Sequence, residues 1–204
     1  MHGPFASASF TISLPQGFYT PAMTDPIQHA LHSAATQNPL LASLSVFCAS
    51  GLLFVLVALL ALTGLLNLRR LTWRLVARVV SSLAVAALLT LLLNHVFTDV
   101  RPFVVEHYTP LAHASNDNGF PSDHGLVAAL LVFWAWWIDR RWLPLFIVGM
   151  LAVMAGRLAI GAHHTLDILG SLIFAAAGFA AASVLRFPAR WGDRTVSRAQ
   201  RQGA

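Results

Sequence analysis

The residues best suited to chemistry fall in one interval, between Arg101 and Asp167. Within it, His163 precedes Asp167 by four residues. A carboxylate that holds one imidazole nitrogen leaves the other free to attack an electrophile, so the pair predicts a nucleophilic histidine oriented by an aspartate. Taken alone, a His–Asp pair at this spacing is also typical of a structural contact or a metal site.

A cation precedes this pair by six residues. Arg157 lies in an otherwise apolar run, where a charge costs about 2.5–3.5 kcal/mol on membrane-insertion scales, so it needs compensation. It either snorkels toward an interface a few positions away or faces the interior and binds an anion. The neighbouring His163 and Asp167 favour the second interpretation, with phosphate as the ligand.

An anion site is also predicted at Pro121-Ser122-Asp123-His124. Pro121-Ser122 indicates a helix N-terminus, whose free N–H groups and dipole attract anions, and the Ser122 hydroxyl adds a donor. His124 then lies in the first helical turn, where it can protonate a leaving oxygen. Arg101-Pro102 supplies a second cation. Each feature alone has an ordinary structural explanation, but together they specify phosphate chemistry.

The composition indicates that a membrane positions these residues. The chain has 204 residues, 57% of them hydrophobic and 10% charged, whereas an average soluble domain has about 25% charged residues. One domain is expected, formed by spanning helices. The single cysteine, Cys48, excludes an intramolecular disulfide and a thiolate metal site. Residues 1–23 are expected to be an irregular lead-in, and they lack the pattern of a cleavable signal.

The predicted fold is an all-α, polytopic membrane helix bundle. A short amphipathic helix is expected from Thr24, with Ile27, Leu31 and Ala35 on its apolar face, and with Gln28 and His32 opposite, at the membrane surface. Because a spanning helix needs about 20 mostly apolar residues, about five stretches qualify. They are 41–66, 76–97, 122–138, 142–161 and 166–185, of which the third is the shortest.

The arginines predict the orientation of this bundle. All 13 basic residues are arginines, and they gather beside apolar runs. Four follow the first span, two follow the third and five lie in the C-terminal part, and the remaining two are Arg101 and Arg157. Such clusters are typical of cytoplasmic loops and not of a nucleic-acid surface. The candidate site is therefore expected on the outer face, with residues 24–186 as the membrane domain and 187–204 as a basic cytoplasmic tail.

These motifs resemble the three-part signature of the type-2 phosphatidic acid phosphatase superfamily. Its first part, a lysine followed after six residues by Arg-Pro, is matched by Asn94 and Arg101-Pro102. Its second, Pro-Ser-Gly-His, is matched at 121–124. Its third, Ser-Arg, five residues, His, three residues and Asp, is matched at 156–167. The forms Arg-Pro-Phe-Val and Phe-Pro-Ser-Asp-His are similar to bacterial undecaprenyl-diphosphatases of the bacitracin-resistance type.

The resemblance implies roles for the matching residues. Arg101, Ser122 and Arg157 would bind phosphate, His163 would attack, Asp167 would orient it, and His124 would act as the acid. The family needs no metal or other cofactor. Three positions depart from the pattern. Asn94 replaces a lysine and would bind through its amide, Asp123 replaces a glycine and would bind through its backbone N–H, and Gly156 replaces a serine.

The function implied is hydrolysis of undecaprenyl diphosphate to the monophosphate by a multi-pass enzyme of the bacterial cytoplasmic membrane. The partners expected are a lipid diphosphate and the bilayer, with no nucleic acid. Phosphatidylglycerol phosphate, phosphatidic acid and lipid A phosphates remain alternative substrates. The missing lysine also leaves open a non-catalytic protein that binds or transports lipid phosphates.

Overall fold

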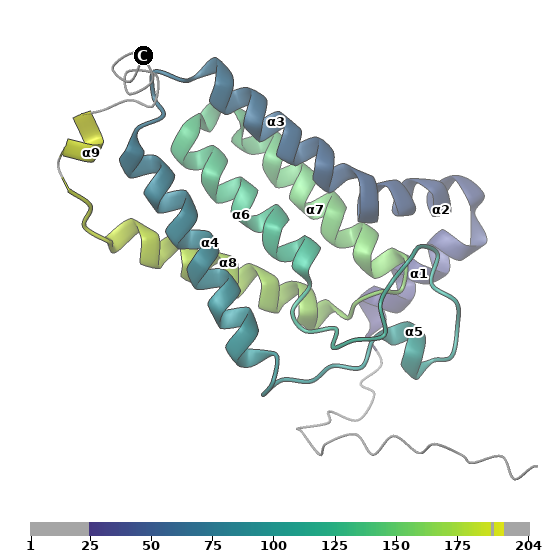
Figure 1. The fold of residues 1–204 in the computed structure, drawn as a ribbon. Helices are drawn as coiled ribbons and strands as arrows, with labels where there is room; N and C mark the ends of the chain where they lie inside the picture. The colour runs from purple at the N-terminus through teal and green to yellow at the C-terminus, as the bar shows by residue number, and fades with distance from the viewer. Residues whose placement is uncertain (1–24, 189, 194–204) are drawn as a thin grey trace, which may run out of the picture.

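The computed structural model describes residues 25–188 and 190–193, and every regular element among them is helical (Figure 1). The predicted lead-in, 1–23, and most of the predicted tail, 187–204, lie outside the described residues. The long helices are α1 (Pro26–Gln37), α3 (Leu52–Leu66), α4 (Trp73–Leu93), α6 (Asp123–Ile138), α7 (Leu143–Ala159) and α8 (Thr165–Val184). The short ones are α2 (Pro39–Val46), α5 (Pro102–Val105) and α9 (Arg190–Asp193). A π-helical turn, Phe47–Gly51, joins α2 to α3. The all-α prediction is confirmed.

Four continuous helical stretches are long and apolar enough to cross a membrane. They are Pro39–Leu66, Trp73–Leu93, Arg140–Ala159 and Thr165–Val184. The fifth predicted span forms α6, whose 16 residues give a length of about 24 Å, short of the roughly 30 Å hydrocarbon core. The described residues therefore form four helices that are long enough to span a membrane, and a fifth apolar helix, α6, that is shorter.

Burial explains why α6 can be short. It lies between α4 on one side and α3 and α7 on the other (Figure 1), and it contacts α8 as well. Leu131 and Ala135 of α6 pack against α3 and α7, whereas Leu126 and Leu130 pack against α4, α7 and α8. Because α6 contributes to both of these clusters, much of its surface contacts protein and not lipid. Its N-terminal end is fixed by this packing within the bundle.

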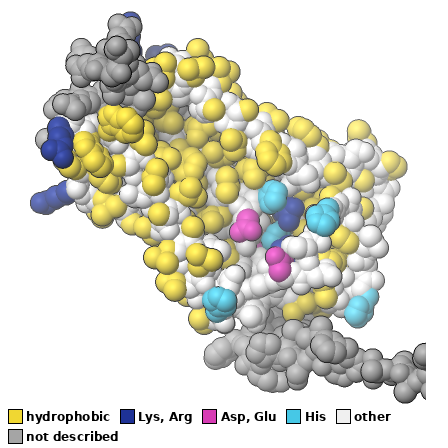
Figure 2. All heavy atoms as spheres, in the orientation of Figure 1, with side chains coloured by type: hydrophobic (Ala, Val, Ile, Leu, Met, Phe, Trp, Pro, Cys, Tyr) yellow, Lys and Arg dark blue, Asp and Glu magenta, His cyan; other side chains and the backbone are white. Residues whose placement is uncertain are grey.

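The outer surface is apolar, as a helix bundle surrounded by lipid requires. Large hydrophobic side chains are exposed along the outer helices, including Phe54, Leu91, Val148 and Ile173. Figure 2 shows hydrophobic side chains over most of the body of the molecule. Histidines and acidic residues gather toward one end, with some basic side chains among them, and further basic residues lie at the other end. This distribution identifies a membrane protein with two chemically different ends.

The helix α4 ends at Leu93, earlier than the predicted limit of 97. The apolar residues Val96 and Phe97 continue the pattern, but the backbone turns there. The amide of Asn118 donates hydrogen bonds to the carbonyls of Asn94 and Phe97, at 2.8 and 2.9 Å. A loop residue distant in sequence thus stabilises the chain reversal that leads to Arg101.

The helix α1 forms where expected, with Leu31 and Ala35 packed inward, but its buried face is displaced from the predicted one. Asp25 caps it by accepting hydrogen bonds from the N–H groups of Ile27 and Gln28. Gln28 and Ala35 are buried, while Ile27 is 54% exposed. His32 Nδ1 lies 2.8 Å from the Ala159 carbonyl at the end of α7. The predicted outward placement of Gln28 and His32 was wrong, because these side chains find hydrogen-bond partners on the bundle.

Close packing accounts for the glycine at 156. A side chain there would place its Cβ 2.7 Å from the backbone nitrogen of Ala49 and 2.8 Å from the Cβ of Cys48. Both belong to the π-helical turn between α2 and α3. The backbone approach leaves no room for the serine found at this position in the family signature.

We therefore expect Gly156→Ser to destabilise the protein even though it restores the signature. Overpacking of this kind costs about 1–3 kcal/mol, and here the neighbour is backbone, which cannot rotate away. The midpoint of thermal unfolding in detergent should fall by several degrees, since about 1 kcal/mol corresponds to roughly 2–4 °C for a chain near this size. Gly64→Ser is the control, because its Cβ would meet only Leu71, at 3.7 Å. Equal midpoints for the two variants would contradict the packing argument.

Candidate active site

Five segments separated in sequence meet at one end of the bundle. They are the loop before α5, the loop between α5 and α6, the start of α6, the end of α7 and the turn between α7 and α8. They surround a cavity of about 170 Å³ lined by Arg101, Asp117, Asp123, His124, Arg157 and His163, together with residues 113–115. The space is sufficient for a phosphate group, while a long lipid chain would have to remain outside it.

His163 lies at the centre of this arrangement, and only 2% of its surface is exposed. Its Nδ1 lies 3.0 Å from the Gly119 carbonyl oxygen and 3.2 Å from Asp167 Oδ2. Since the Gly119 carbonyl can only accept, Nδ1 carries the proton. Its Nε2 lies 3.2 Å from Arg101 Nη1 and 3.1 Å from Arg157 Nη2, which can only donate. The imidazole therefore presents a lone pair on Nε2 toward the two arginines, as a nucleophile must.

The surroundings also keep this imidazole neutral. Burial lowers the pKa of His163 well below its ordinary value, and the positive charges of Arg157 and Arg101 lower it further. A protonated His163 would have no lone pair at Nε2. The same two guanidinium groups that attract an anionic substrate thus keep the attacking nitrogen unprotonated.

The two arginines are buried at the base of the cavity, with 7% of Arg101 and 6% of Arg157 exposed. Arg101 Nη1 donates to the Ala162 carbonyl at 3.0 Å, which fixes the guanidinium against the turn that carries His163. Arg157 Nε is buried without a hydrogen-bond partner. Arg101 also has an acceptor in Asp117, whereas Arg157 lacks enough protein acceptors, so an anion in the cavity would complete its contacts. The placement of Arg157 agrees with the prediction that it faces the interior.

Asp167 lies behind His163, completely buried in the first turn of α8. Its Oδ2 accepts hydrogen bonds from His163 Nδ1 and from the backbone N–H of His164, the latter at 2.9 Å. The same carboxylate therefore orients the imidazole and caps its own helix. The backbone carbonyl of Asp167 also accepts a hydrogen bond from the Ser122 N–H, at 3.3 Å, which joins α8 to the start of α6.

The predicted helix N-terminus is present at the start of α6. Ser122 is the N-cap, and its hydroxyl accepts a hydrogen bond from the Gly125 N–H at 3.4 Å. The hydroxyl is buried behind the cavity. Asp123 and His124 line the cavity itself, with Asp123 exposed at its rim and His124 half-buried. The first turn of α6 therefore directs a helix N-terminus and one imidazole toward the same space as Arg101 and Arg157.

Asn94 is not among the residues that line the cavity. It caps the C-terminus of α4, and its carbonyl is engaged by Asn118. The structure therefore brings together seven of the eight predicted site residues, in the cavity or directly behind it, and leaves Asn94 outside. Within the described residues that line the cavity, the cations are Arg101 and Arg157, with no side chain in place of the signature lysine.

Asp117 also contacts the site, although it lies in a loop and outside the sequence motifs. Its Oδ1 accepts hydrogen bonds from Arg101 Nη2 at 2.7 Å and Nε at 3.2 Å, and from the Ser115 hydroxyl at 2.6 Å. The Ser115 hydrogen bond and the Arg101 guanidinium hold the pKa of Asp117 below its usual value, although burial opposes them. Nothing in the spacing indicates this contact, because it depends on the path of the loop.

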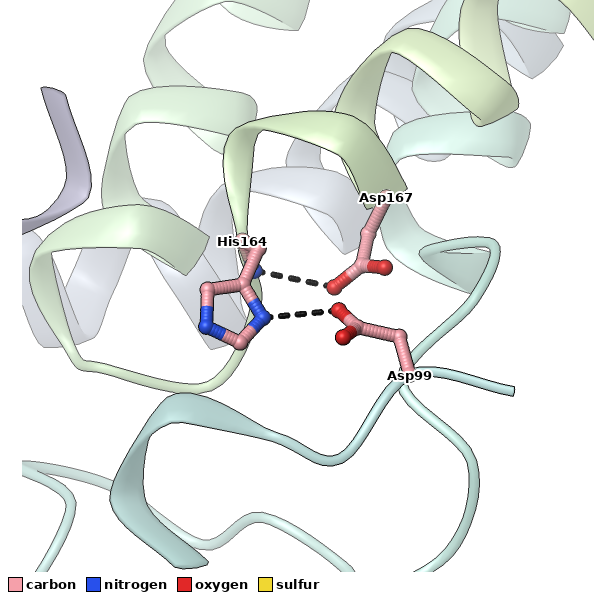
Figure 3. Close-up of side chains that lie close together, drawn as sticks. All are labelled: Asp99, His164 and Asp167. Carbon is pink, nitrogen blue, oxygen red and sulfur yellow. Dashed lines mark hydrogen bonds and ion pairs between the residues drawn. The ribbon is translucent and has the colours of Figure 1, made fainter. Parts of the chain in front are cut away.

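A second group of polar residues lies beside Asp167. The side chains of Asp99, His164 and Asp167 bring potential metal-ligand atoms within 4.8 Å of one another, the one such group among the described residues (Figure 3). The Nδ1 of His164 already bonds Asp99 Oδ2 at 2.7 Å, and Asp167 Oδ2 already accepts two N–H donors. The atoms that the dashed lines join are therefore already paired with protein groups, whereas Asp167 Oδ1 has no hydrogen-bond partner.

Comparison with known proteins agrees with this geometry. Residues 75–191 match the family model described as the PAP2 superfamily. The chain is 33% identical over 161 residues to a protein of Escherichia coli (strain K12) named "Putative undecaprenyl-diphosphatase YbjG", covering 76% of this chain and 78% of that protein. It is 37% identical over 87 residues to the undecaprenyl-diphosphatase BcrC of Bacillus subtilis (strain 168), covering 41% and 44%. No solved structure gives a significant match.

The family match extends over more than half of the chain and contains every site residue from Asn94 to Asp167. The alignment with the Escherichia coli protein, at 33% identity, covers about three quarters of the chain. The apolar helices place this site in a membrane protein. The chain therefore belongs to the PAP2 superfamily and is a membrane lipid phosphatase.

Proposed function

We propose that the protein hydrolyses undecaprenyl diphosphate to undecaprenyl phosphate and inorganic phosphate through a phosphohistidine intermediate. The observation that carries this proposal is the convergence of two buried guanidinium groups on the unprotonated Nε2 of His163. A site that only bound phosphate would need the cations but not a nitrogen nucleophile oriented by Asp167. The names of both relatives support the choice of substrate.

In the proposed mechanism, the terminal phosphate of the lipid enters the cavity between Arg101 and Arg157. Nε2 of His163 attacks the terminal phosphorus in line, a P–N bond forms, and the bridging P–O bond breaks. His124 donates its proton to the departing oxygen of undecaprenyl phosphate. The two guanidinium groups and the N-terminus of α6 at Ser122, with the backbone N–H of Asp123, stabilise the charge on the transferred group.

The second half-reaction regenerates the enzyme. His124, now unprotonated, removes a proton from a water molecule that attacks phosphorus, and the P–N bond breaks. Inorganic phosphate leaves, and His163 Nε2 recovers its lone pair. His124 and His163 both line the cavity, so each can reach the same phosphate from a different element. Asn94 has no contact with the cavity that would support a role as phosphate ligand.

We place the site on the outer side of the bacterial cytoplasmic membrane. Arg70, Arg140 and Arg141 line a second cavity at the other end of the bundle, where α6 ends and α7 begins. By the positive-inside rule, that end faces the cytoplasm. The candidate site, at the opposite ends of α6 and α7, then faces the exterior, where a cell-wall lipid carrier releases its cargo.

The direct test is release of inorganic phosphate by the purified protein in detergent, with chelator present. Undecaprenyl diphosphate is compared with phosphatidylglycerol phosphate, phosphatidic acid and a lipid A phosphate. We expect the highest kcat/KM for undecaprenyl diphosphate, unchanged by chelator. Preference for another lipid would reassign the substrate, and loss of activity in chelator would contradict a reaction carried by protein groups alone. Tight binding without release from any lipid would favour a non-catalytic binding protein.

A further inference from the structure

His164, next to the proposed nucleophile in sequence, lies among three carboxylates from three separate segments. Asp99 comes from the loop after α4, and its Oδ2 is 2.7 Å from His164 Nδ1. Asp167 of α8 accepts the His164 backbone N–H. Asp25, which precedes α1, accepts hydrogen bonds from the N–H and hydroxyl of Thr165, the next residue. Figure 3 shows His164 facing Asp99, with Asp167 directly above Asp99.

The buried carboxylate of Asp167 needs a compensating cation. It is fully buried, its Oδ1 has no hydrogen-bond partner, and an isolated charge in such a position is strongly unfavourable. Both arginines of the site approach His163 from the other side of its ring, at Nε2, while Asp167 lies at Nδ1. His163 itself is neutral. Of the described neighbours of Asp167, His164 is the side chain that can carry the missing charge.

The environment of His164 favours that charge. Partial burial opposes protonation, but the hydrogen bond and charge of Asp99, together with the charges of Asp167 and Asp25, raise the pKa of His164 above its ordinary value. Its side chain is 19% exposed, so the ring can exchange protons with water. The two adjacent histidines therefore differ, because His163 faces two arginines and His164 faces three carboxylates.

We propose that His164, held as an imidazolium by Asp99, is a positioning residue that keeps Asp167 ionised and thereby keeps the proton of His163 on Nδ1. This inference rests on the proposed function of His163 as nucleophile. A neutral Asp167 would accept a hydrogen bond less strongly and could donate to Nδ1, which would move the lone pair away from Nε2. The pair Asp99–His164 would then act on the reaction without touching the substrate.

The variant His164→Asn removes the positive charge of the His164 side chain and is expected to keep the fold. Asparagine is a favourable N-cap residue, and its amide can still donate to Asp99, so α8 keeps its start while the cation is lost. A unit charge within about 4–6 Å shifts a pKa by roughly 1–3 units. We expect the acid limb of kcat/KM to move to higher pH by about one unit or more, with activity near pH 6 about tenfold lower and recovery toward the wild-type value at alkaline pH.

The matched control is His95→Asn, the same substitution at an exposed histidine. It should leave the profile unchanged. A purely structural role for His164 would lower kcat/KM by the same factor at every pH, and that result would overturn the proposal. An unshifted, fully active His164→Asn variant would overturn it as well. His164→Lys, which restores a cation, should return the acid limb toward its wild-type position.

A second measurement is independent of turnover. In protein labelled with ¹⁵N-histidine, the imidazole of His164 should titrate above the ordinary range of histidine, and Asp99→Asn should lower its midpoint. The side chain of Asp99 bonds His164, whereas the contacts of its backbone with Asn118 and Gly119 remain in the variant. A His164 that titrates within or below the ordinary range of histidine would sink the proposal even in an active enzyme. If no lipid phosphate is hydrolysed, the proposed function fails, and this titration still decides whether His164 is the cation beside Asp167.

Discussion

The His163→Ala variant is expected to release phosphate from undecaprenyl diphosphate at least about 10³-fold more slowly than the wild type. Removing a nucleophile that works with an orienting partner costs up to roughly 10⁶ in kcat in comparable catalytic units. The variant keeps Arg101 and Arg157, so phosphate should still bind. Initial rates of phosphate release, measured with the competitive binding of orthovanadate, separate lost chemistry from lost binding.

Trapping the proposed phosphohistidine intermediate is a second and more specific test of the same variant. With terminally ³²P-labelled substrate and rapid quenching, wild-type protein should retain a label that is stable to base and released by acid, as a phosphoramidate is. His163→Ala should retain none. The control is His95→Ala, which removes an exposed imidazole and should leave turnover and labelling intact. Full activity of His163→Ala would sink the assignment of the nucleophile.

The catalytic logic of the site lies in the dual role of its two arginines. Before substrate binds, burial lowers the pKa of His163 and the charges of the two arginines lower it further, which keeps Nε2 free. When a diphosphate enters, its negative charge offsets them, and the same groups then stabilise the transferring phosphoryl group. Asp117, in the loop before α6, binds Arg101 before substrate arrives, with its Oδ1 2.7 Å from Arg101 Nη2. The guanidinium is thus fixed in place before the phosphate arrives, which reduces the reorganisation that binding requires.

Much of the bundle was predictable because hydrophobic length is a strong local signal. The four long spans follow from apolar runs, and the start of α6 follows from Pro121-Ser122, where the N-cap lies. The convergence of Arg101, Arg157 and His163 was also predictable, since each motif was expected at the same end of its span. The structure places both arginines on one nitrogen of His163.

The remaining contacts depend on how loops cross the end of the bundle, which local patterns do not encode. Asp99 meets His164 across 65 residues, and Asp25 meets Thr165 across 140. The buried face of α1 was displaced from the predicted one for a similar reason. Gln28 bonds the hydroxyl of Tyr108, a loop residue 80 positions away, at 3.1 Å. Amphipathic spacing could identify that helix, but it could not identify the polar partners that turned it inward.

Asp167→Asn is expected to lower kcat by about 10²–10³ and to leave KM nearly unchanged. Asp167 does not line the cavity, so substrate binding keeps its contacts. The amide oxygen can still accept from His163 Nδ1 and the His164 N–H, while the negative charge that stabilises the reacting imidazole is lost. In a triad whose aspartate alone sets the tautomer, the equivalent change costs about 10⁴. Separate determination of kcat and KM tests the expectation.

The smaller loss expected here has a specific structural cause. The Gly119 carbonyl also accepts from His163 Nδ1, at 3.0 Å, so the proton has a second partner when Asp167 becomes neutral. Asp167→Ala removes both the charge and the acceptor for the His164 N–H, and it should therefore be less active than Asp167→Asn. Asp139→Asn, the same change near Arg70 at the other end of the bundle, is the control and should remain active. Equal inactivity of Asp167→Asn and Asp167→Ala, together with weaker substrate binding in both, would contradict this expectation. Asp167 would then stabilise the structure of the site, and the Gly119 carbonyl would orient His163.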